Sequence, residues 1–472
     1  MFDDFSMTID GAPVRTESGV AVHNPATGEV IAKAPRADAC HVDRAVSAAR
    51  AAQPGWQATP LVERQRLVRA LAGVARAREA DFARLLTLEQ GKPLHASRGA
   101  FYEVRSIQTW FEAVARRGAP TECLLDSESR KVHVVREPLG VVAAIAPWNF
   151  PMTLAVWKIA PALVTGNTVV FKPSPHTPLT MLKFAEYASS LLPPGVLNVI
   201  SGDDSLGPLL TAHPGVDKIA FTGSTPTGKA ILRDAVQTMK RVTLEMGGND
   251  PAIVFDDVDV DAIVPKLFWG AFANSAQFCL AIKRLYVHDR IYDRLLESLV
   301  AFAKAVRMGN GLDEGVALGP IQNRVQHDRL ACLLAGAGAR RERIVLGGAL
   351  PEGPGNFVPV TIVDNPEDDS PTVVEEAFGP VLPLLRFSNV EDVVRRANHS
   401  PYGLGASVWS ADAPRAAAVA ARLQAGTVWI NTIHVMSPDY VFGGYKQSAF
   451  GRENGQEGLL EYTQTKTLIT EC

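Results

Sequence analysis

One cysteine of the chain stands where a nucleophile could be held. Cys279 ends a segment with helical character, and a strand is predicted to begin shortly after it, near Arg284. Most lone cysteines are small buried hydrophobic residues, but sites on parallel sheets are built at such element ends. Because a thiol with a pKa of about 8.5 attacks well only beside a base or an electropositive group, Cys279 needs a partner.

Glu245 is the candidate base. It follows an apolar strand and precedes Gly247 and Gly248, which allow a sharp turn and close approach of the backbone. A carboxylate among apolar neighbours tends to have a raised pKa, which suits it to activate a thiol or a water molecule. An ion pair with an arginine is the alternative interpretation of this glutamate.

Asn149 is a candidate donor to an oxyanion. It lies between Trp148 and Phe150, and Pro147 and Pro151 restrict the backbone on either side. An asparagine in a turn is usually only a turn former. The aromatic and proline neighbours favour a positioned amide that donates to negative charge developing on a substrate oxygen.

Two turns indicate a nucleotide site. Lys172 and Ser174 place a cation and a hydroxyl directly after one predicted strand. The segment 222–229, which contains Gly223 and Ser224, follows another strand and opens a helix. Backbone amides and the dipole at such a helix start attract a pyrophosphate, although the segment departs from the G-x-G-x-x-G fingerprint.

Strands and helices alternate from residue 132 onward, which predicts an α/β fold with parallel sheets covered on both faces. The strands are predicted at 132–136, 141–146, 168–171, 196–200, 218–221, 252–255, 284–288, 343–346, 360–363, 381–387, 406–409 and 427–430. The tail, 462–469, looks like a strand without an obvious hairpin partner in the chain, and is therefore a candidate for pairing with another subunit.

Composition excludes several classes of protein. The 472 residues suffice for about three domains, and a net charge of −3 argues against a nucleic-acid or anionic-membrane partner. The first ten residues lack the basic start of a signal peptide, and no apolar run reaches the ~20 residues of a membrane helix. Five scattered cysteines without a CxxC spacing suggest neither disulfides nor a metal site. We therefore expect a cytoplasmic protein without a metal.

Seven motifs, taken in order along the chain, resemble those of the aldehyde dehydrogenase superfamily. They are PWNFP at 147–151, FKPS at 171–174, FTGST at 221–225, LEMGG at 244–248, the Cys279 segment, EEAFGP at 375–380 and FGGYKQS at 442–448. The resemblance implies an α/β, aldehyde dehydrogenase-like fold. Its parts would be a Rossmann-like cofactor domain (1–118 and 137–246), an α/β catalytic domain (247–440) and a small β oligomerisation element (119–136 and 455–472).

The same resemblance implies a role for each residue. Cys279 would attack the aldehyde carbon, the Asn149 side chain and the Cys279 amide would hold the oxyanion, and Glu245 would activate the water that hydrolyses the resulting thioester. The implied cofactor contacts are Trp148, Lys172, Ser174, Gly223, Ser224, Glu376 and Phe378. The expected cofactor is NAD, with NADP tolerated, and the expected assembly is a homodimer or homotetramer.

Four positions depart from the family pattern. Ala276 stands where glycine is usual, and its methyl group could shift the cysteine loop unless the local φ accommodates it. Asn249 replaces a lysine, and Ala449 replaces a glycine. Pro175 stands where many NAD-preferring relatives carry a glutamate that repels a 2′-phosphate, which leaves the choice between NAD and NADP open.

An apolar, aromatic mouth is predicted for the substrate, formed by Phe150, Leu154, Trp157 and Phe278. Such a mouth favours an uncharged aromatic or medium aliphatic aldehyde, and packing of a helix is the other interpretation of Leu154 and Trp157. Tyr440 and His434 are further candidates for the tunnel.

Three alternatives stay open beside this function. A semialdehyde dehydrogenase of the same family is one, although relatives that act on succinic semialdehyde tend to place an arginine at the position of Trp157. A CoA-acylating relative would generally lack a glutamate at the position of Glu245. A non-catalytic relative would not need the intact set of Cys279, Glu245 and Asn149.

Overall fold

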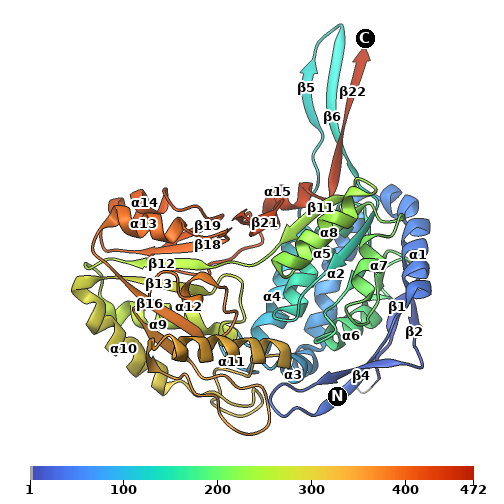
Figure 1. Cartoon of the computed structure of the whole chain (residues 1–472). Helices are drawn as coiled ribbons and strands as arrows, with labels where there is room; N and C mark the ends of the chain where they lie inside the picture. Colours follow the sequence, from blue (N-terminus) through green and yellow to red (C-terminus); the bar gives the residue numbers. More distant parts are fainter. Residues whose placement is uncertain (1–3) are drawn as a thin grey trace.

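The computed structural model describes residues 4–472, which form two large sheets with their helices and a protruding arm (Figure 1). The first sheet has the strand order β2-β1-β9-β8-β7-β10-β11-β21, with parallel central strands and antiparallel strands at both edges. Its strands are β1 (Met7–Ile9), β2 (Ala12–Val14), β7 (Val141–Ile145), β8 (Thr168–Lys172), β9 (Leu197–Val199), β10 (Lys218–Thr222), β11 (Arg241–Glu245) and β21 (Ala449–Phe450).

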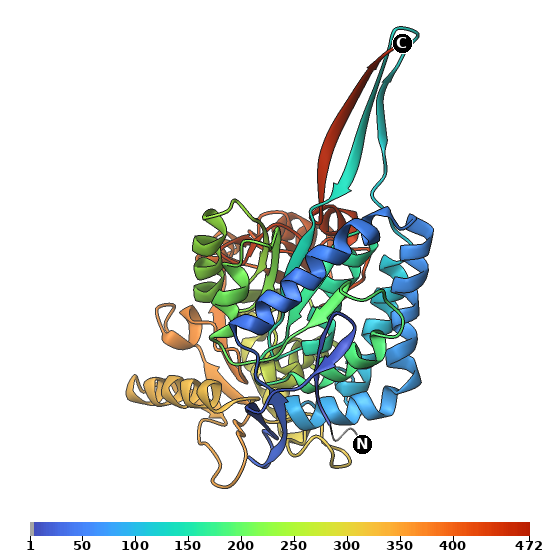
Figure 2. The same cartoon turned by 90° about the vertical axis from the view of Figure 1, so that its right-hand side faces the viewer.

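Helices from the first half of the chain surround this sheet, and Figure 2 shows the N-terminal ones, in blue, lying across its strands. They are α1 (Ala39–Ala58), α2 (Leu61–Ala77), α3 (Glu79–Gln90), α4 (Ala100–Val114), α5 (Pro151–Val164), α6 (Leu179–Ala188), α7 (Leu206–Thr211) and α8 (Thr225–Val236). A separate hairpin is formed by β3 (Gly19–His23) and β4 (Val30–Pro35).

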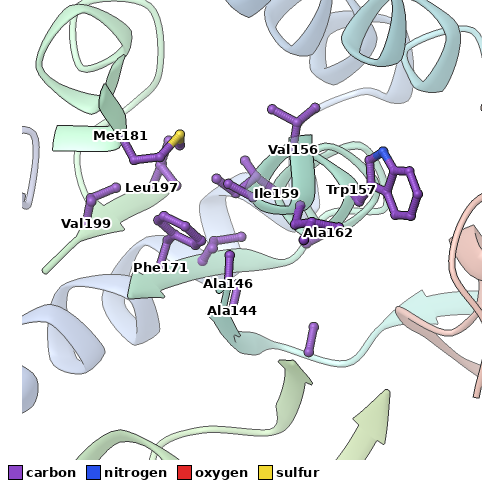
Figure 3. Close-up of a cluster of buried hydrophobic side chains, with 14 of the residues drawn as sticks. Ala144, Ala146, Val156, Trp157, Ile159, Ala162, Phe171, Met181, Leu197 and Val199 are labelled. Atoms are coloured by element: carbon purple, nitrogen blue, oxygen red, sulfur yellow. The ribbon is translucent and has the colours of Figure 1, made fainter. Parts of the chain in front are cut away.

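Apolar packing fixes the position of α5 on the sheet. Ile159 and Ala162 of α5 are fully buried and lie beside Ala144 of β7 and Phe171 of β8 (Figure 3). Burial of such side chains is the dominant favourable contribution to folding. Because the PWNFP segment connects β7 to α5, this packing also sets the place of the turn that carries Asn149.

The second sheet has the order β14-β15-β16-β13-β12-β18-β19 and is parallel except for its edge strand β14. Its strands are β12 (Asp250–Val254), β13 (Ile282–His288), β14 (Arg343–Leu346), β15 (Thr361–Asp364), β16 (Val381–Phe387), β18 (Gly405–Trp409) and β19 (Thr427–Ile430). The helices of this half are α9 (Val260–Phe272), η1 (Ala273–Ala276), η2 (Asp289–Ile291), α10 (Tyr292–Ala305), α11 (Arg324–Ala339), α12 (Pro371–Val374), α13 (Val390–Asn398) and α14 (Ala413–Ala420). Two short strands, β17 (Tyr402–Gly403) and β20 (Tyr445–Lys446), pair with each other.

The arm consists of β5 (Glu122–Asp126), β6 (Arg130–Pro138) and β22 (Thr463–Glu471), which follows α15 (Gly455–Leu460). The resemblance placed the C-terminal strand in one β element with residues 119–136, and this grouping is confirmed, whereas the local pattern offered no partner for the strand within the chain. β22 runs antiparallel to β6, with pairs from Thr463↔Pro138 to Glu471↔Arg130. The two strands are far apart in the sequence, so no hairpin signal announces them. Both outer edges of the arm stay open, and no helix among residues 4–472 is long and apolar enough to span a membrane.

A left-handed turn precedes Cys279. Asn274, Ser275 and Ala276 have φ values of 53°, 53° and 58°, and left-handed backbone costs about 1–2 kcal/mol for each residue other than glycine. The turn is held by hydrogen bonds, among them one from Ser275 Oγ to the Gly319 carbonyl at 2.6 Å. Ala276, which replaces the glycine usual in the family, therefore occupies a strained position.

We predict that the two substitutions Ala276→Gly and Ala273→Gly differ in stability by about 1–2 kcal/mol, with Ala276→Gly the more stable. Each removes one buried methyl group and adds the same freedom to the unfolded chain. Only residue 276 has a positive φ, because Ala273 has a φ of −52°. Thermal and denaturant unfolding of the two variants measure the difference, and equal stabilities would contradict the strain at Ala276.

Candidate active site

Two cavities meet at Cys279. The first, called here the aromatic cavity, has a volume of about 550 Å³ and contains all the residues predicted for the substrate mouth, namely Phe150, Leu154, Trp157 and Phe278. The second, called the central cavity, has a volume of about 690 Å³ and is lined by Trp148, Gly223, Ser224, Glu376 and Phe378. Asn149 and Cys279 line both cavities. The chain therefore gathers these predicted residues around one sulfur atom.

The Cys279 thiol is in a poorly solvated setting. Burial raises its pKa to about 12, and the nearby Lys283 ammonium opposes this rise. Lys283 Nζ also donates to the backbone carbonyl of Cys279 at 2.6 Å and to that of Phe278 at 3.2 Å. Lys283 thus holds the cysteine loop by its backbone. It lies near the start of β13, directly before Arg284, and nothing in the sequence pattern singled it out.

Glu245, at the end of β11, is buried, and neither of its carboxylate oxygens has a hydrogen-bond partner within residues 4–472. Burial raises its pKa well above the ordinary value, and the neighbouring Glu453 raises it further, while Lys158 opposes both. Lys158 is itself buried, and its Nζ is 2.6 Å from a Glu453 oxygen and 2.6 Å from Thr222 Oγ1. The alternative that Glu245 pairs with an arginine is wrong, because no ion pair to this carboxylate is present in the described residues.

Asn149 connects the first half of the fold to the cysteine loop. Its Nδ2 donates to the Gln277 carbonyl at 3.0 Å. Its own backbone carbonyl accepts from Lys92 Nζ at 3.0 Å and from Asn274 Nδ2 at 3.2 Å. Because Nδ2 carries two hydrogens, the second one stays free to meet an oxygen in the cavities.

A buried ion pair supports the Asn149 turn from below. Lys92 pairs with Glu103 of α4, and both side chains have no exposed surface. Glu103 Oε1 also accepts from the backbone amides of Met152 and Thr153, at 2.9 and 3.0 Å, in the first turn of α5. Removing one partner of such a pair typically costs about 3–5 kcal/mol. These residues position the site without lining it, and single-sequence patterns do not reveal such long-range pairs.

A third cavity, called the outer cavity, extends from the central one along the carboxyl ends of the first sheet. It has a volume of about 1340 Å³ and shares Trp148, Thr222, Gly223 and Ser224 with the central cavity. Its far part is lined by Lys172, Ser174, Pro175 and Asp204. The continuous space is thus long enough to take an elongated ligand.

The lining residues fit a dinucleotide. Ser224 caps the N-terminus of α8 by accepting from the Thr227 amide, where free amides and the helix dipole attract phosphate. Gly223 is required next to it, since a Cβ there would lie 2.4 Å from the Phe221 ring. Burial lowers the pKa of Lys172, and the carboxylates of Asp204 and Asp203 oppose this shift.

At the other end of the central cavity, Glu376 Oε1 accepts from the Gly248 amide at 3.1 Å and lies 3.4 Å from Lys283 Nζ. The Phe378 ring meets Trp148 edge-on, with centroids 5.5 Å apart. Glu376 and Phe378 were inferred from one motif only, and they lie on the same cavity wall.

The aromatic cavity also contains residues that the sequence did not single out, namely Arg98, Tyr102, Ser106, Trp110, Thr153, Leu280, Met436 and Phe442. Arg98, Tyr102, Ser106 and Trp110 follow one another at intervals of four, which is the spacing of one helix face, and this periodicity was the available signal. Neither His434 nor Tyr440 lines the cavity. His434 packs behind Phe278, with ring centroids 4.6 Å apart, and bonds to the Leu280 carbonyl at 2.7 Å.

Asn249 and Ala449, the other departures, have structural contacts. Asn249 Nδ2 donates to the Val373 carbonyl at 2.8 Å, and Ala449 pairs with Glu245 across β21 and β11. Neither residue lines the cavities at Cys279.

Comparison with known proteins identifies the family. A profile of the aldehyde dehydrogenase family matches residues 13–468. The putative aldehyde dehydrogenase FUS7 of Gibberella fujikuroi is 40% identical over 466 residues, which cover 99% of this chain and 98% of that protein.

Solved structures agree with the sequence comparison. Betaine aldehyde dehydrogenase from Staphylococcus aureus, in complex with NAD+, has a TM-score of 0.94 at 34% identity, over 98% of this chain and 94% of that one. The structure of an E. coli NADP-dependent enzyme has a TM-score of 0.96 at 35% identity, over 100% and 98% of the two chains. The resemblance inferred from the seven motifs and the fold it implies are confirmed. The chain belongs to the aldehyde dehydrogenase family.

Proposed function

We propose that this protein oxidises an aldehyde to the carboxylic acid with NAD(P)+ through a thioester on Cys279. The observation that carries the proposal is the place of Cys279 at the junction of the aromatic and central cavities. The aromatic cavity fits the organic group of an aldehyde, and the central cavity fits a nicotinamide. A sulfur atom between them can bond to the carbonyl carbon while the hydrogen on that carbon faces the cofactor.

The first half of the reaction needs a base and an oxyanion donor. Because burial raises the pKa of the Cys279 thiol, a neighbouring base has to remove its proton. We assign this role to Glu245, a buried carboxylate whose charge acts on the thiol. As the bond from Sγ to carbon forms, the carbonyl electron pair moves to oxygen, where Asn149 Nδ2 and the Cys279 amide donate to it. A nicotinamide held beside Trp148 and Phe378 in the central cavity would supply the hydride acceptor, and loss of hydride from the adduct would leave a thioester on Cys279.

Hydrolysis completes the cycle. Glu245 takes a proton from water while the water oxygen attacks the thioester carbon. The carbon–sulfur bond then breaks, the carboxylic acid leaves and the thiol is restored. Aldehyde, oxidised cofactor and water become acid, reduced cofactor and one proton. A CoA-acylating reaction needs no base for water, so the buried Glu245 favours hydrolysis. The intact set of Cys279, Glu245 and Asn149 likewise argues against a non-catalytic protein.

The variant Cys279→Ala is expected to lose at least about 10³-fold in NADH formation, since no thioester can form. Binding of NAD+, measured by calorimetry, is expected to persist. The matched control is Cys332→Ala, which changes an exposed cysteine outside these cavities and is expected to keep the parental rate. Turnover by Cys279→Ala within tenfold of the parent would refute the covalent route.

We propose that the body of the substrate is aromatic or medium aliphatic. The support is the lining of the aromatic cavity, where the rings of Phe150 and Phe278 lie 5.2 Å apart and those of Trp157 and Phe442 also lie 5.2 Å apart. An uncharged aldehyde of this kind was the sequence-based expectation. Arg98 lines the same cavity. Whether the substrate carries a charged group at the end away from the aldehyde is therefore a question separate from the nature of its body.

We further propose that NAD is preferred over NADP. Pro175 offers no carboxylate, but Asp204 lines the same part of the outer cavity as Lys172 and Ser174. A carboxylate beside the adenosine ribose accepts from its hydroxyls and repels a 2′-phosphate. Asp204 thus supplies from a different loop the repulsion that position 175 lacks.

Replacing Asp204 by Asn is expected to raise kcat/KM for NADP relative to NAD by roughly tenfold, because one repulsive charge is removed. The control is Asp203→Asn. Asp203 pairs with Arg36 at 2.7 Å and does not line the cavity, so the cofactor ratio of that variant is expected to stay at the parental value. Equal ratios in the parent and both variants would contradict the role of Asp204.

We propose that the protein forms a homo-oligomer through the arm, with the two sheets acting as the cofactor and catalytic domains. Leu468 and Ile469 of the open edge strand β22 are 46% and 65% exposed, and open edges invite pairing with another chain. Light scattering of the purified protein is expected to give a multiple of the 50.7 kDa chain mass. Ile469→Lys is expected to shift the mass toward the monomer, and a parental mass of one chain would refute the proposal.

A further inference from the structure

A cation lies in the wall of the aromatic cavity. Arg98, directly before α4, lines the cavity together with Cys279 and Phe278. Its guanidinium carbon lies 5.8 Å from the centre of the Phe278 ring and 5.7 Å from that of Tyr102. This charge is therefore next to the residue that precedes the reactive cysteine.

The Arg98 guanidinium is only partly satisfied by the chain. Its Nη2 donates to the His434 carbonyl at 3.1 Å, whereas a guanidinium has five N–H donors. Arg98 is half-buried, and burial lowers its pKa. No ion pair of Arg98 with a carboxylate exists within residues 4–472. A poorly solvated cation without a counter-ion is costly, so an anion in the cavity would be stabilised there.

A second donor beside the same cavity also lacks an acceptor. Trp157 projects from α5 on the side away from Ile159 and Phe171 (Figure 3), and its buried Nε1 has no hydrogen-bond partner in the described residues. Its stacked neighbour Trp110 differs, since Trp110 Nε1 donates to Asn454 at 2.9 Å. Trp157 Nε1 is buried rather than open to the cavity, so the charge that the cavity offers to a ligand is the Arg98 guanidinium, and no carboxylate is among the lining residues.

The two walls of the cavity differ in character. On the α4 side, Arg98, Tyr102 and Ser106 lie at intervals of four and form a polar stripe. On the α5 side, Leu154 and Trp157 present an apolar surface beside Phe150. A ligand that fits both walls has an apolar body and an acceptor-rich, negatively charged group.

We propose that Arg98 selects aldehydes that carry a carboxylate on an aromatic or aliphatic body, and that it disfavours cationic aldehydes. The proposal rests on the function proposed above and specifies its substrate class. An arginine and a carboxylate form two parallel hydrogen bonds, which orient the far end of the substrate.

The test compares matched pairs of substrates with the whole enzyme and NAD+. One pair set is 3- and 4-carboxybenzaldehyde against 3- and 4-methylbenzaldehyde, and another is four- to six-carbon ω-oxo acids against the alkanals of equal length. We expect at least one acid to exceed its neutral partner about tenfold in kcat/KM. If, in every pair, kcat/KM of the acid is equal to or lower than that of its neutral partner, the proposal is overturned. Betaine aldehyde turned over better than every acid would also overturn it.

The variant Arg98→Met is expected to lower the ratio of kcat/KM for an acid to that for its neutral partner about tenfold, chiefly through the KM of the acid. Arg98→Lys is expected to retain part of the preference, because the charge stays and the paired hydrogen bonds are lost. Arg105→Met is the control, since Arg105 is exposed on α4 and bonds to Glu79 at 2.8 Å. Equal losses for acid and neutral substrates in Arg98→Met would contradict selection by this residue. If Arg98→Met does not fold, the proposal is tested by the acid preference of Arg98→Lys and by that of the parent enzyme on the same substrate pairs.

Binding without turnover separates this proposal from the covalent mechanism. Terephthalate, a dicarboxylate that resembles the product of 4-carboxybenzaldehyde, is the probe for calorimetry on the enzyme when 4-carboxybenzaldehyde is the preferred acid. The diacid of an ω-oxo acid replaces it when that acid is preferred. We expect binding by the parent and by Cys279→Ala, and a loss of about tenfold in Arg98→Met. Binding that is equal in the parent and Arg98→Met would refute the role of Arg98, whereas failure of turnover with this binding pattern intact would refute only the thioester route.

Discussion

The hydrogen bond from the Asn149 side chain to the Gln277 carbonyl joins the two halves of the site. Asn149 belongs to the turn between β7 and α5 of the first sheet, and Gln277 belongs to the loop before β13 of the second. Each side of this bond has its own support. The buried pair of Lys92 and Glu103 holds the Asn149 turn, and the Gln277 amide bonds to the carbonyls of Asn274 and Pro320. The position of Cys279 between two cavities depends on both.

The buried ionisable groups that the proposed reaction uses lower the stability of the folded state when they are charged. Burial raises the pKa of Glu245 and of Cys279, so each group holds its proton more tightly than it would in water. For Glu245 the folded state holds its proton more tightly than the unfolded chain does. Its contribution to stability therefore falls as pH rises above the ordinary carboxylate pKa. Strain at Ala276 is a second cost located at the same loop, as is common at functional sites.

The positions of most strands were predictable because they follow from local sequence patterns. The strands predicted from residue 132 onward all appear, with ends within two residues of the prediction, since buried parallel strands are short apolar runs. Strands β1 and β2 were missed, because three-residue strands leave no period to detect. The pairing of β22 with β6 joins segments more than 300 residues apart, so the local pattern gave no sign of it; only the family resemblance placed both segments in one β element. Contacts between segments far apart in the sequence set the roles of Lys92, Glu103 and Arg98 in the same way. The candidate residues Cys279, Glu245 and Asn149 were found because each follows a strand or helix end or carries unusual neighbours.

The central claim is that one carbon is bonded to Cys279 between oxidation and hydrolysis, with Glu245 acting on the second step. The most direct measurement mixes Glu245→Gln rapidly with NAD+ and an aldehyde that the parent enzyme oxidises, and follows NADH together with the intact mass of the protein. The account predicts one stoichiometric burst of NADH that is slower than in the parent, because the thiol has lost its base, then still slower turnover, and an added acyl mass on the peptide that contains Cys279. Steady NADH formation at the parental rate, without an acyl adduct, would contradict it.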